Sequence, residues 1–206
     1  MNIHRIVVSP FETNCYLIGC ETTGKAAVID PGDSVETIIE SAESNGLIIE
    51  KILNTHAHID HTAGVHEMKT HLGIPFYLHK DDEFLLARIM EQGSMFGMHV
   101  EHKPEVDVYL HDGDALNIGK ETVTILHTPG HSPGGCCLLT ENGLFAGDTL
   151  FAGSIGRHDL PGGSYETLIH SIRTKLLVLD DGLNVYCGHG PATTIGIEKR
   201  SNRFLV

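Results

Sequence analysis

The sequence predicts an α/β protein in which two β-sheets carry helices on their outer faces. Short apolar runs alternate with amphipathic stretches along the whole chain, and each half consists of several predicted strands followed by helix. The length of 206 residues suits one domain spanning 1–206, and the composition of 41% hydrophobic and 20% charged residues is ordinary for a globular protein. We therefore expect a packed core rather than a disordered or collagen-like chain.

In the first half, three apolar runs are followed by alternating helices and strands. The strands are expected at 3–8, 14–19, 25–30, 48–54 and 75–79, and the helices at 34–45, 62–72 and 81–92. Turn-forming residues separate them at Asp30-Pro31-Gly32, Asn45-Gly46 and Gly73-Ile74-Pro75. The stretch from about 90 to 104 is rich in Met and His and lacks periodicity, which makes it a candidate lid.

In the second half, strands predominate. They are expected at 106–111, 122–127, 135–140, 143–147 and 183–187, with helices at 164–179 and 193–199. Asp112-Gly113 and Asp181-Gly182 mark turns. Asn142-Gly143 lies between two apolar runs and predicts a tight β-hairpin.

Charge and cysteine content exclude several classes of protein. With 14 Lys and Arg against 27 Asp and Glu, the net charge of −13 disfavours binding to nucleic acid. No apolar run reaches the roughly 20 residues that a membrane span needs, and the N-terminus does not resemble a signal peptide. The five cysteines are odd in number and form no CxxC pair, so we expect core packing, a reducing compartment and a cytoplasmic location.

The densest group of potential metal ligands follows the apolar run at 48–53. It is the segment Thr55-His56-Ala57-His58-Ile59-Asp60-His61, in a chain with 15 histidines. Alternate residues of an extended segment share a face, so His56, His58 and Asp60 can project together. His61 falls where the helical pattern begins and points in another direction. Four ligands aimed in two directions suit two adjacent metal ions, and imidazole and carboxylate groups suit zinc, iron or manganese.

Three further candidate ligands follow later strands and lie close to glycines. His131 lies in a segment with two prolines and three glycines (129–135), Asp148 follows Gly147, and His189 lies between two glycines. Glycine allows the backbone to approach an ion closely. Each residue alone is typical of a turn, but together with the first group they complete a set of five histidines and two aspartates.

In these residues the sequence resembles the metallo-β-lactamase superfamily, whose pattern HxHxDH, then His, Asp and His, covers nearly the whole chain. The segments 147–151, 153–157 and 187–191 look like those of short, single-domain type II glyoxalases, which hydrolyse S-acylglutathione thioesters. The resemblance implies a four-layer αββα sandwich and two divalent metal ions, with zinc as the first expectation. By the same resemblance, one ion is held by His56, His58 and His131, the other by Asp60, His61 and His189, with Asp148 bridging them.

The implied reaction is hydrolysis of a small thioester, such as S-D-lactoylglutathione, to D-lactate and glutathione. Two ions about 3.5–4 Å apart lower the pKa of a shared water toward ~7, so a metal-bridging hydroxide is the expected nucleophile. The thiol that leaves has a pKa of about 8.5 and needs no strong general acid. Asp60 is the candidate catalytic residue, because it can orient this hydroxide, although ligation alone explains it equally well. Asp30 is a candidate partner for a ligand histidine, or else part of a plain turn.

The departures from the resemblance concern the thiol half of the substrate. Longer type II glyoxalases carry a C-terminal helical domain that helps to hold glutathione, whereas only 17 residues follow His189 here. They also have a Lys-x-Tyr pair, where this chain has Arg157-His158-Asp159. Arg157 is therefore the candidate for binding a glutathione carboxylate, because its planar donor fork suits that geometry, with a surface role as the alternative.

The main alternative on the same fold is an iron-dependent persulfide dioxygenase. That resemblance implies a single iron held by His56, His131 and Asp148, and it also includes a Gly-Arg pair after the Asp148 segment. A β-lactamase fits less well, because those zinc enzymes usually have a Cys in the second site. A non-catalytic metal-binding protein fits least, because all seven ligands are present. His66 and His71 are five residues apart and so do not form the HExxH motif.

Overall fold

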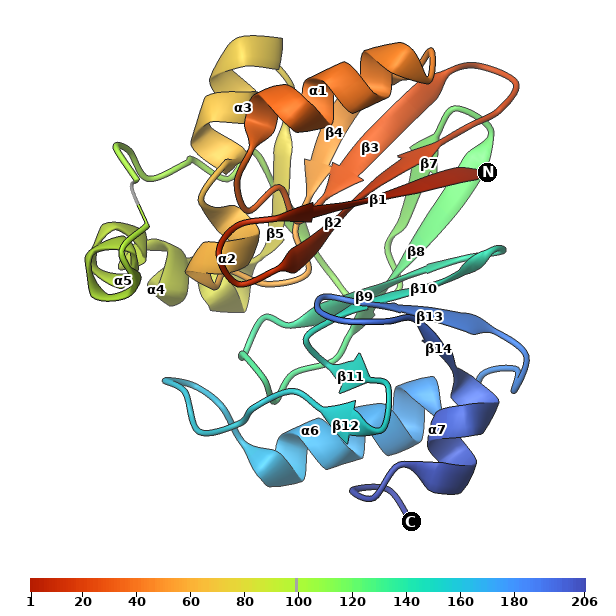
Figure 1. Cartoon of the computed structure of the whole chain (residues 1–206). Coiled ribbons are helices and arrows are strands. Elements are labelled where there is room, and N and C mark those ends of the chain that lie inside the picture. The colour runs from red at the N-terminus through yellow and green to blue at the C-terminus, as the bar shows by residue number, and fades with distance from the viewer. Residues whose placement is uncertain (99) are drawn as a thin grey trace.

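The computed structural model describes residues 1–98 and 100–206. Two six-stranded sheets face each other, with helices on both outer faces (Figure 1). The strand order is β1-β2-β3-β4-β5-β6 in the N-terminal sheet and β14-β13-β10-β9-β8-β7 in the C-terminal sheet. The predicted α/β class and the αββα layers are confirmed.

In the N-terminal sheet, β1, β2 and β3 are antiparallel, and β3 to β6 run parallel. The strands are β1 (Asn2–Val8), β2 (Thr13–Gly19), β3 (Lys25–Ile29), β4 (Ile48–Leu53), β5 (Phe76–His79) and β6 (Val108–Leu110). Helices α1 (Val35–Ser44) and α3 (Val65–Leu72) pack on β4, and the short α2 (Ile59–Thr62) follows that strand. Because β3 and β4 are parallel neighbours, the residues that follow them meet at one edge of the sheet.

In the C-terminal sheet, only β10 and β13 pair in parallel. The strands are β7 (Ala115–Ile118), β8 (Glu121–His127), β9 (Cys136–Thr140), β10 (Gly143–Gly147), β13 (Asn184–Cys187) and β14 (Thr193–Thr194). A two-stranded sheet of β11 (Leu150–Phe151) and β12 (Ser154–Ile155) lies beside it. Helix α6 (Tyr165–Ser171), continued by a π-helical stretch (Ile172–Leu176), and α7 (Ile195–Ser201) cover its outer face (Figure 1).

Three apolar layers hold the sandwich together. The central layer lies between the sheets and includes Ile18, Leu53, Leu138 and Phe145, and the two outer layers lie under the helices. A strand in this arrangement is buried on both faces, which explains why the inner strands read as continuous apolar runs rather than alternating patterns. All five cysteines are free and buried, as predicted. Among the described residues, no helix combines the length and apolarity needed to cross a bilayer.

Several element boundaries differ from the prediction. Strand β7 and the two-residue strands β11, β12 and β14 were not predicted, because they are too short to show a clear pattern. The helix expected at 62–72 is α3, which begins at Val65, and the short helix α2 before it was not predicted. The one expected at 81–92 consists of a 3₁₀ turn (Lys80–Asp82), α4 (Glu83–Leu86) and α5 (Ile89–Phe96). The candidate lid at 90–104 thus begins inside a helix, its residue 99 lies outside the described residues, and lid movement stays a prediction.

The predicted Asn142-Gly143 hairpin is confirmed, although its turn is shifted by one residue. Thr140 pairs with Gly143, so Glu141 and Asn142 form the two-residue loop. Gly143 has φ +155°, and a Cβ on it would lie 2.6 Å from Cε2 of Tyr186 on the neighbouring strand. The glycine is therefore needed for close strand packing as well as for the turn.

Candidate metal centre

Three histidine nitrogens converge at the edge where the two sheets meet. His56 and His58 follow β4, and His131 lies in the loop between β8 and β9. His131 Nε2 lies 2.8 Å from His58 Nδ1 and 3.2 Å from His56 Nε2. All three side chains are buried. We refer to them as the three-histidine group.

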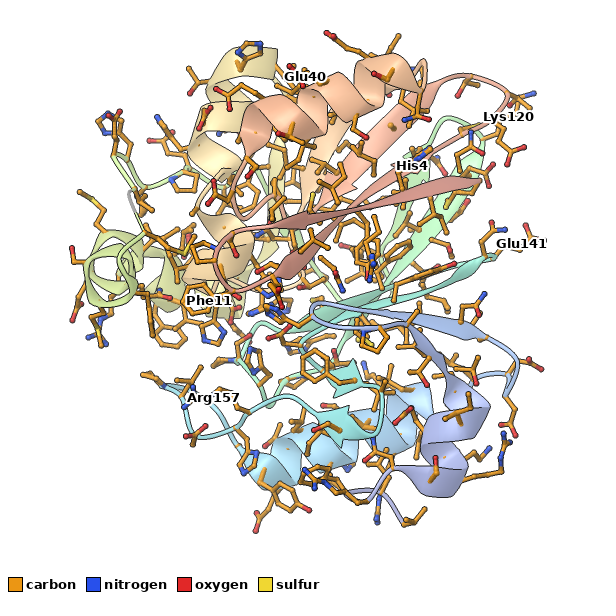
Figure 2. All side chains as sticks on the ribbon, viewed as in Figure 1. His4, Phe11, Glu40, Lys120, Glu141 and Arg157 are labelled. Carbon is orange, nitrogen blue, oxygen red and sulfur yellow. The ribbon has the colours of Figure 1, made fainter. Side chains whose placement is uncertain are left out.

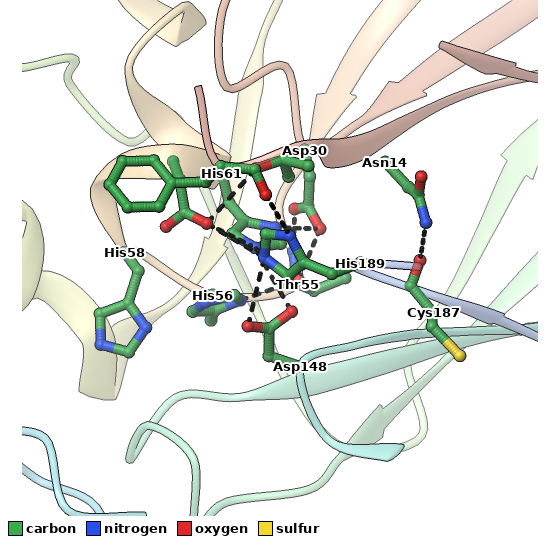
Figure 3. A network of polar contacts seen from close by, with 12 residues as sticks. Asn14, Asp30, Thr55, His56, His58, His61, Asp148, Cys187 and His189 are labelled. Atoms are coloured by element: carbon green, nitrogen blue, oxygen red, sulfur yellow. Dashed lines mark hydrogen bonds and ion pairs between the residues drawn. The ribbon is translucent and has the colours of Figure 1, made fainter. Parts of the chain in front are cut away.

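A second group of potential metal ligands lies beside the first and consists of Asp60, His61 and His189. Figure 3 shows His61 and His189 of this group next to Asp148. Nε2 of His189 lies 3.1 Å from Asp60 Oδ2 and 3.3 Å from Nε2 of His61. Asp148, at the end of β10, lies between the groups: its carboxylate is 3.4 Å from His61 Nε2, 3.6 Å from His189 Nε2 and 3.7 Å from His131 Nε2. The structure thus brings together all seven side chains that the sequence analysis selected as ligands.

Hydrogen bonds on the far side of each ring direct four of these histidines. Nδ1 of His131 donates to the Arg157 carbonyl at 2.7 Å, and Nδ1 of His189 donates to the Phe11 carbonyl at 3.0 Å. A ring nitrogen that donates in this way leaves the lone pair on Nε2 free to face the centre. His58 differs, since its Nδ1 is the atom that faces the group.

Asp30 orients the other two histidines, His61 directly and His56 through Thr55. These contacts support the role that the sequence suggested for Asp30, as a partner of a ligand histidine. Its Oδ2 accepts from His61 Nδ1 at 3.0 Å and from the Thr55 hydroxyl at 2.7 Å, and Thr55 in turn accepts from His56 Nδ1 (Figure 3). Asp30 has φ +52°, a conformation rarely adopted by residues other than glycine. The hydrogen bonds from Thr55 and His61 hold this backbone conformation, which places one carboxylate against His61 and, through Thr55, against His56.

Burial and charge prepare the two groups differently for a cation. Burial lowers the pKa of His58 to about 3, and burial together with the neighbouring rings lowers that of His56, so these two imidazoles are uncharged at neutral pH. In the second group, burial lowers the pKa of His61, but the carboxylates around it outweigh that effect and raise it. Oδ1 of Asp148 is buried without a hydrogen-bond partner among the described residues. A buried carboxylate oxygen in this state is costly unless a cation compensates it, so the donor set fits divalent metal binding.

Asp82 holds together the two loops that carry the three-histidine group, and no sequence motif pointed to it. This buried carboxylate accepts hydrogen bonds from the backbone N–H of Ala57 at 2.9 Å, the hydroxyl of Ser132 at 2.8 Å and the backbone N–H of Gly134 at 2.6 Å. Ala57 separates His56 from His58, and Ser132 follows His131 directly. One side chain therefore fixes the distance between the loops.

The loop that carries His189 is tied to β2 of the opposite sheet. Nδ2 of Asn14 donates to the carbonyl of Cys187 at 2.9 Å (Figure 3). It also donates to the carbonyl of Gly190 at 2.9 Å, and the Tyr16 hydroxyl donates to the Cys187 carbonyl at 2.7 Å. Both donors come from a strand in which every residue is buried. Their polar groups, in a strand whose other residues after Thr13 are apolar or glycine, were the signal available in the sequence.

Close packing at Gly188 gives a testable prediction. A Cβ at this position would lie 2.2 Å from Asp148 Oδ1 and 2.9 Å from His61 Cε1. We expect Gly188→Ala to displace both side chains and reduce bound metal per chain about 10-fold or more, as measured by atomic absorption after dialysis. Gly190→Ala is the control, because nothing lies within 4 Å of its Cβ, and its positive φ should cost only about 1 kcal/mol in unfolding free energy. Equal metal content in the two variants would contradict this account.

A second cluster of potential ligands, His79, Asp81 and His127, has the wrong geometry for metal binding. The two imidazole rings stack face to face, with centroids 4.0 Å apart and planes at 10°. An imidazole nitrogen binds an ion in the plane of its ring, so two parallel stacked rings cannot share one ion. His127 Nε2 instead donates to the carbonyl of Pro133 at 2.9 Å.

A cavity of about 690 Å³ opens at the site, and five of the seven side chains line it: His58, Asp60, His131, Asp148 and His189. Arg157 lies on its rim, as expected for a residue that contacts substrate, but its guanidinium already forms a two-point ion pair with Asp159 at 2.9 and 3.0 Å. The pair is exposed to solvent and therefore weak, so a substrate carboxylate can compete for this arginine. A substrate contact for Arg157 stays a prediction.

The αββα fold and the converging His and Asp side chains define a metallo-hydrolase. The sequence profile of the metallo-beta-lactamase superfamily matches residues 8–189, and the chain belongs to that superfamily. The resemblance identified from the sequence motifs is thereby confirmed.

Three similar proteins give a more detailed comparison. The chain is 42% identical over 214 residues to the hydroxyacylglutathione hydrolase GloC of Haemophilus influenzae, covering 100% of this chain and 98% of that protein. Among solved structures, BLEG-1 B3 metallo-beta-lactamase is 36% identical with a TM-score of 0.92, and each chain is covered completely. TTHA1623 in a di-iron-bound form is also 36% identical, with a TM-score of 0.89 over 98% of this chain and 100% of that chain.

Proposed function

We propose that this protein is a metal-dependent thioester hydrolase that acts on S-acylglutathione-type substrates, with S-D-lactoylglutathione as the reference substrate. The convergence of five histidines and two aspartates beneath a cavity is the observation on which the proposal rests. It is supported by similarity over the whole chain to a relative named hydroxyacylglutathione hydrolase.

The residues that would hold two ions follow from the two groups of side chains. His56 Nε2, His58 Nδ1 and His131 Nε2 would bind one ion. Asp60, His61 and His189 would bind the other, and Asp148 lies within reach of both. When bound, two divalent ions lower the pKa of a shared water toward ~7 and stabilise negative charge that develops on a carbonyl oxygen.

The protein's own side chains contribute orientation and charge. The Asp60 carboxylate stays ionised at neutral pH, because burial raises its pKa but nearby His61 and His189 lower it further. The Thr13 hydroxyl donates to Asp60 Oδ2 at 3.3 Å and fixes that oxygen, which can then accept a hydrogen bond from the attacking water. The leaving thiol has a pKa of about 8.5, so the thiolate departs without a general acid.

The decisive experiment compares the metal-stripped protein with the same sample reloaded with zinc, following loss of thioester absorbance from S-D-lactoylglutathione. We expect zinc to restore turnover with kcat/KM above about 10⁴ M⁻¹s⁻¹, the lower end for committed enzymes. Absence of turnover while zinc is demonstrably bound would overturn the proposal.

Iron-dependent persulfide oxidation is the second candidate, because a neighbour of 36% identity was solved in a di-iron-bound form and so accepts iron. Histidine and carboxylate ligands accept iron as readily as zinc, so ligand type does not separate the two reactions. Oxygen consumption by the iron-reloaded protein with glutathione persulfide, combined with no thioester hydrolysis, would establish this alternative.

A further inference from the structure

One side of the cavity is formed by large apolar side chains that are partly exposed to solvent. They are Phe11, in the loop between β1 and β2, and Met95 and Phe96 at the end of α5, and we call these three the apolar wall. Their exposed fractions are 40%, 72% and 49%. The rings of Phe11 and Phe96 meet edge to face, with centroids 5.7 Å apart. Figure 2 shows Phe11 on the side of the molecule where α4 and α5 lie.

Hydrogen bonds attach the apolar wall to the metal-ligand groups on both of its sides. The Phe11 carbonyl accepts from Nδ1 of His189 at 3.0 Å. On the other side, Gln92 of α5 accepts from the backbone N–H of Ile59 at 3.2 Å and donates to the Leu85 carbonyl at 2.8 Å. Ile59 lies between His58 and Asp60. The wall is therefore held next to the place where a reacting carbonyl would lie.

The charged groups on the cavity rim are paired with each other. Arg88 forms a two-point ion pair with Glu91, with both distances 2.9 Å, and Arg157 pairs with Asp159 in the same way. No lysine lines the cavity among the described residues. Apart from the metal-ligand groups, the lining near the wall offers apolar surface and no unpaired cation.

From this arrangement we propose that the apolar wall binds the acyl half of the substrate, and that the protein prefers thioesters whose acyl group is an apolar chain of several carbons. The inference rests on the proposed thioester hydrolysis. The acyl chain is bonded directly to the reacting carbonyl carbon, so its first carbons must lie beside the metal-ligand groups, where the wall is attached. Glutathione, the thiol half of the substrate, carries charged groups and is better matched to the rim near Arg157. Burial of the exposed wall by an acyl chain supplies the binding free energy.

The test uses the zinc-loaded full chain and a matched series of S-acylglutathiones with acetyl, butyryl, hexanoyl and octanoyl groups, below their critical micelle concentrations. We expect kcat/KM to rise about two- to fourfold per methylene until the wall is covered, since each buried methylene contributes on this scale. Met95→Ala and Phe96→Ala should each flatten this dependence. Met90→Ala is the matched control, because Met90 lies on the same helix, is 53% exposed and does not line the cavity. It should leave the chain-length dependence unchanged.

The outcomes separate this inference from the proposed function. If kcat/KM of the unmodified protein did not change with acyl chain length while S-D-lactoylglutathione was still hydrolysed, the acyl preference would be overturned. The proposed thioester hydrolysis would be unaffected. A dependence that persists unchanged in Met95→Ala and Phe96→Ala would overturn the assignment to the wall. Failure to hydrolyse any thioester would refute the proposed function itself, and the inference with it.

Discussion

Replacing His58 by alanine will lower metal-dependent kcat/KM by about 10³-fold or more and leave the fold intact. The change removes the nitrogen that lies 2.8 Å from His131 Nε2 and leaves the three-histidine group with two imidazoles. Metal ions contribute several kcal/mol to stabilising a developing charge, and each 1.36 kcal/mol corresponds to about tenfold in rate. In the metal-free protein the variant loses only the contact between His58 and His131, so its unfolding midpoint should barely change.

The measurement is kcat/KM for S-D-lactoylglutathione after reconstitution with zinc, together with metal content and a thermal unfolding curve. His71→Ala provides a matched control, because His71 is an exposed histidine on α3 outside both metal-ligand groups. It should retain full activity and metal content. Near-normal turnover by the His58 variant after reconstitution would exclude the proposed role of the three-histidine group.

Replacing Asp82 by alanine will destabilise the protein and weaken metal binding, although Asp82 is not one of the seven proposed ligands. The change leaves three buried donors without their partner: the N–H groups of Ala57 and Gly134 and the Ser132 hydroxyl. Each unpaired buried donor costs about 1–3 kcal/mol, so the expected loss is about 3 kcal/mol or more in unfolding free energy. For a chain of this size, that lowers Tm by about 6–12 °C.

Thermal unfolding of the metal-free protein and zinc titration with a competing chelator measure the two effects. Asp82→Asn keeps one acceptor oxygen and should show smaller losses of both stability and affinity, which also covers the case in which the alanine variant fails to fold. Asp81→Ala is the control, because its carboxylate is 59% exposed and holds neither histidine loop. Normal zinc affinity in folded Asp82→Asn and Asp82→Ala would show that the loops hold their positions without this carboxylate.

The sequence by itself determined the fold class and the set of candidate ligands. Strands buried on both faces leave continuous apolar runs, and helices between them leave amphipathic ones, so the two-sheet arrangement was visible in local patterns. The candidate ligands were recognisable as a set: four of them share the segment 55–61, and the other three each follow a predicted strand next to a glycine, although each alone is typical of a turn. His56, His58 and Asp60 also share a short segment, so their proximity needed no knowledge of the remaining chain.

The tertiary structure alone decided which ordinary residues support and surround these ligands. Asp82 lies 50 residues from Ser132 in sequence, and Asn14 lies 173 residues from Cys187, so no local pattern connects them. The sequence left two roles open for Asp30, a turn residue or a partner of a ligand histidine. The structure shows both, because Asp30 has a turn conformation and also contacts His61 and Thr55. The apolar wall is likewise invisible in the sequence, because Phe11 and Phe96 become neighbours only when the chain folds. A side chain's residue type is fixed locally, but its hydrogen-bond partners and solvent exposure depend on segments far away in the chain.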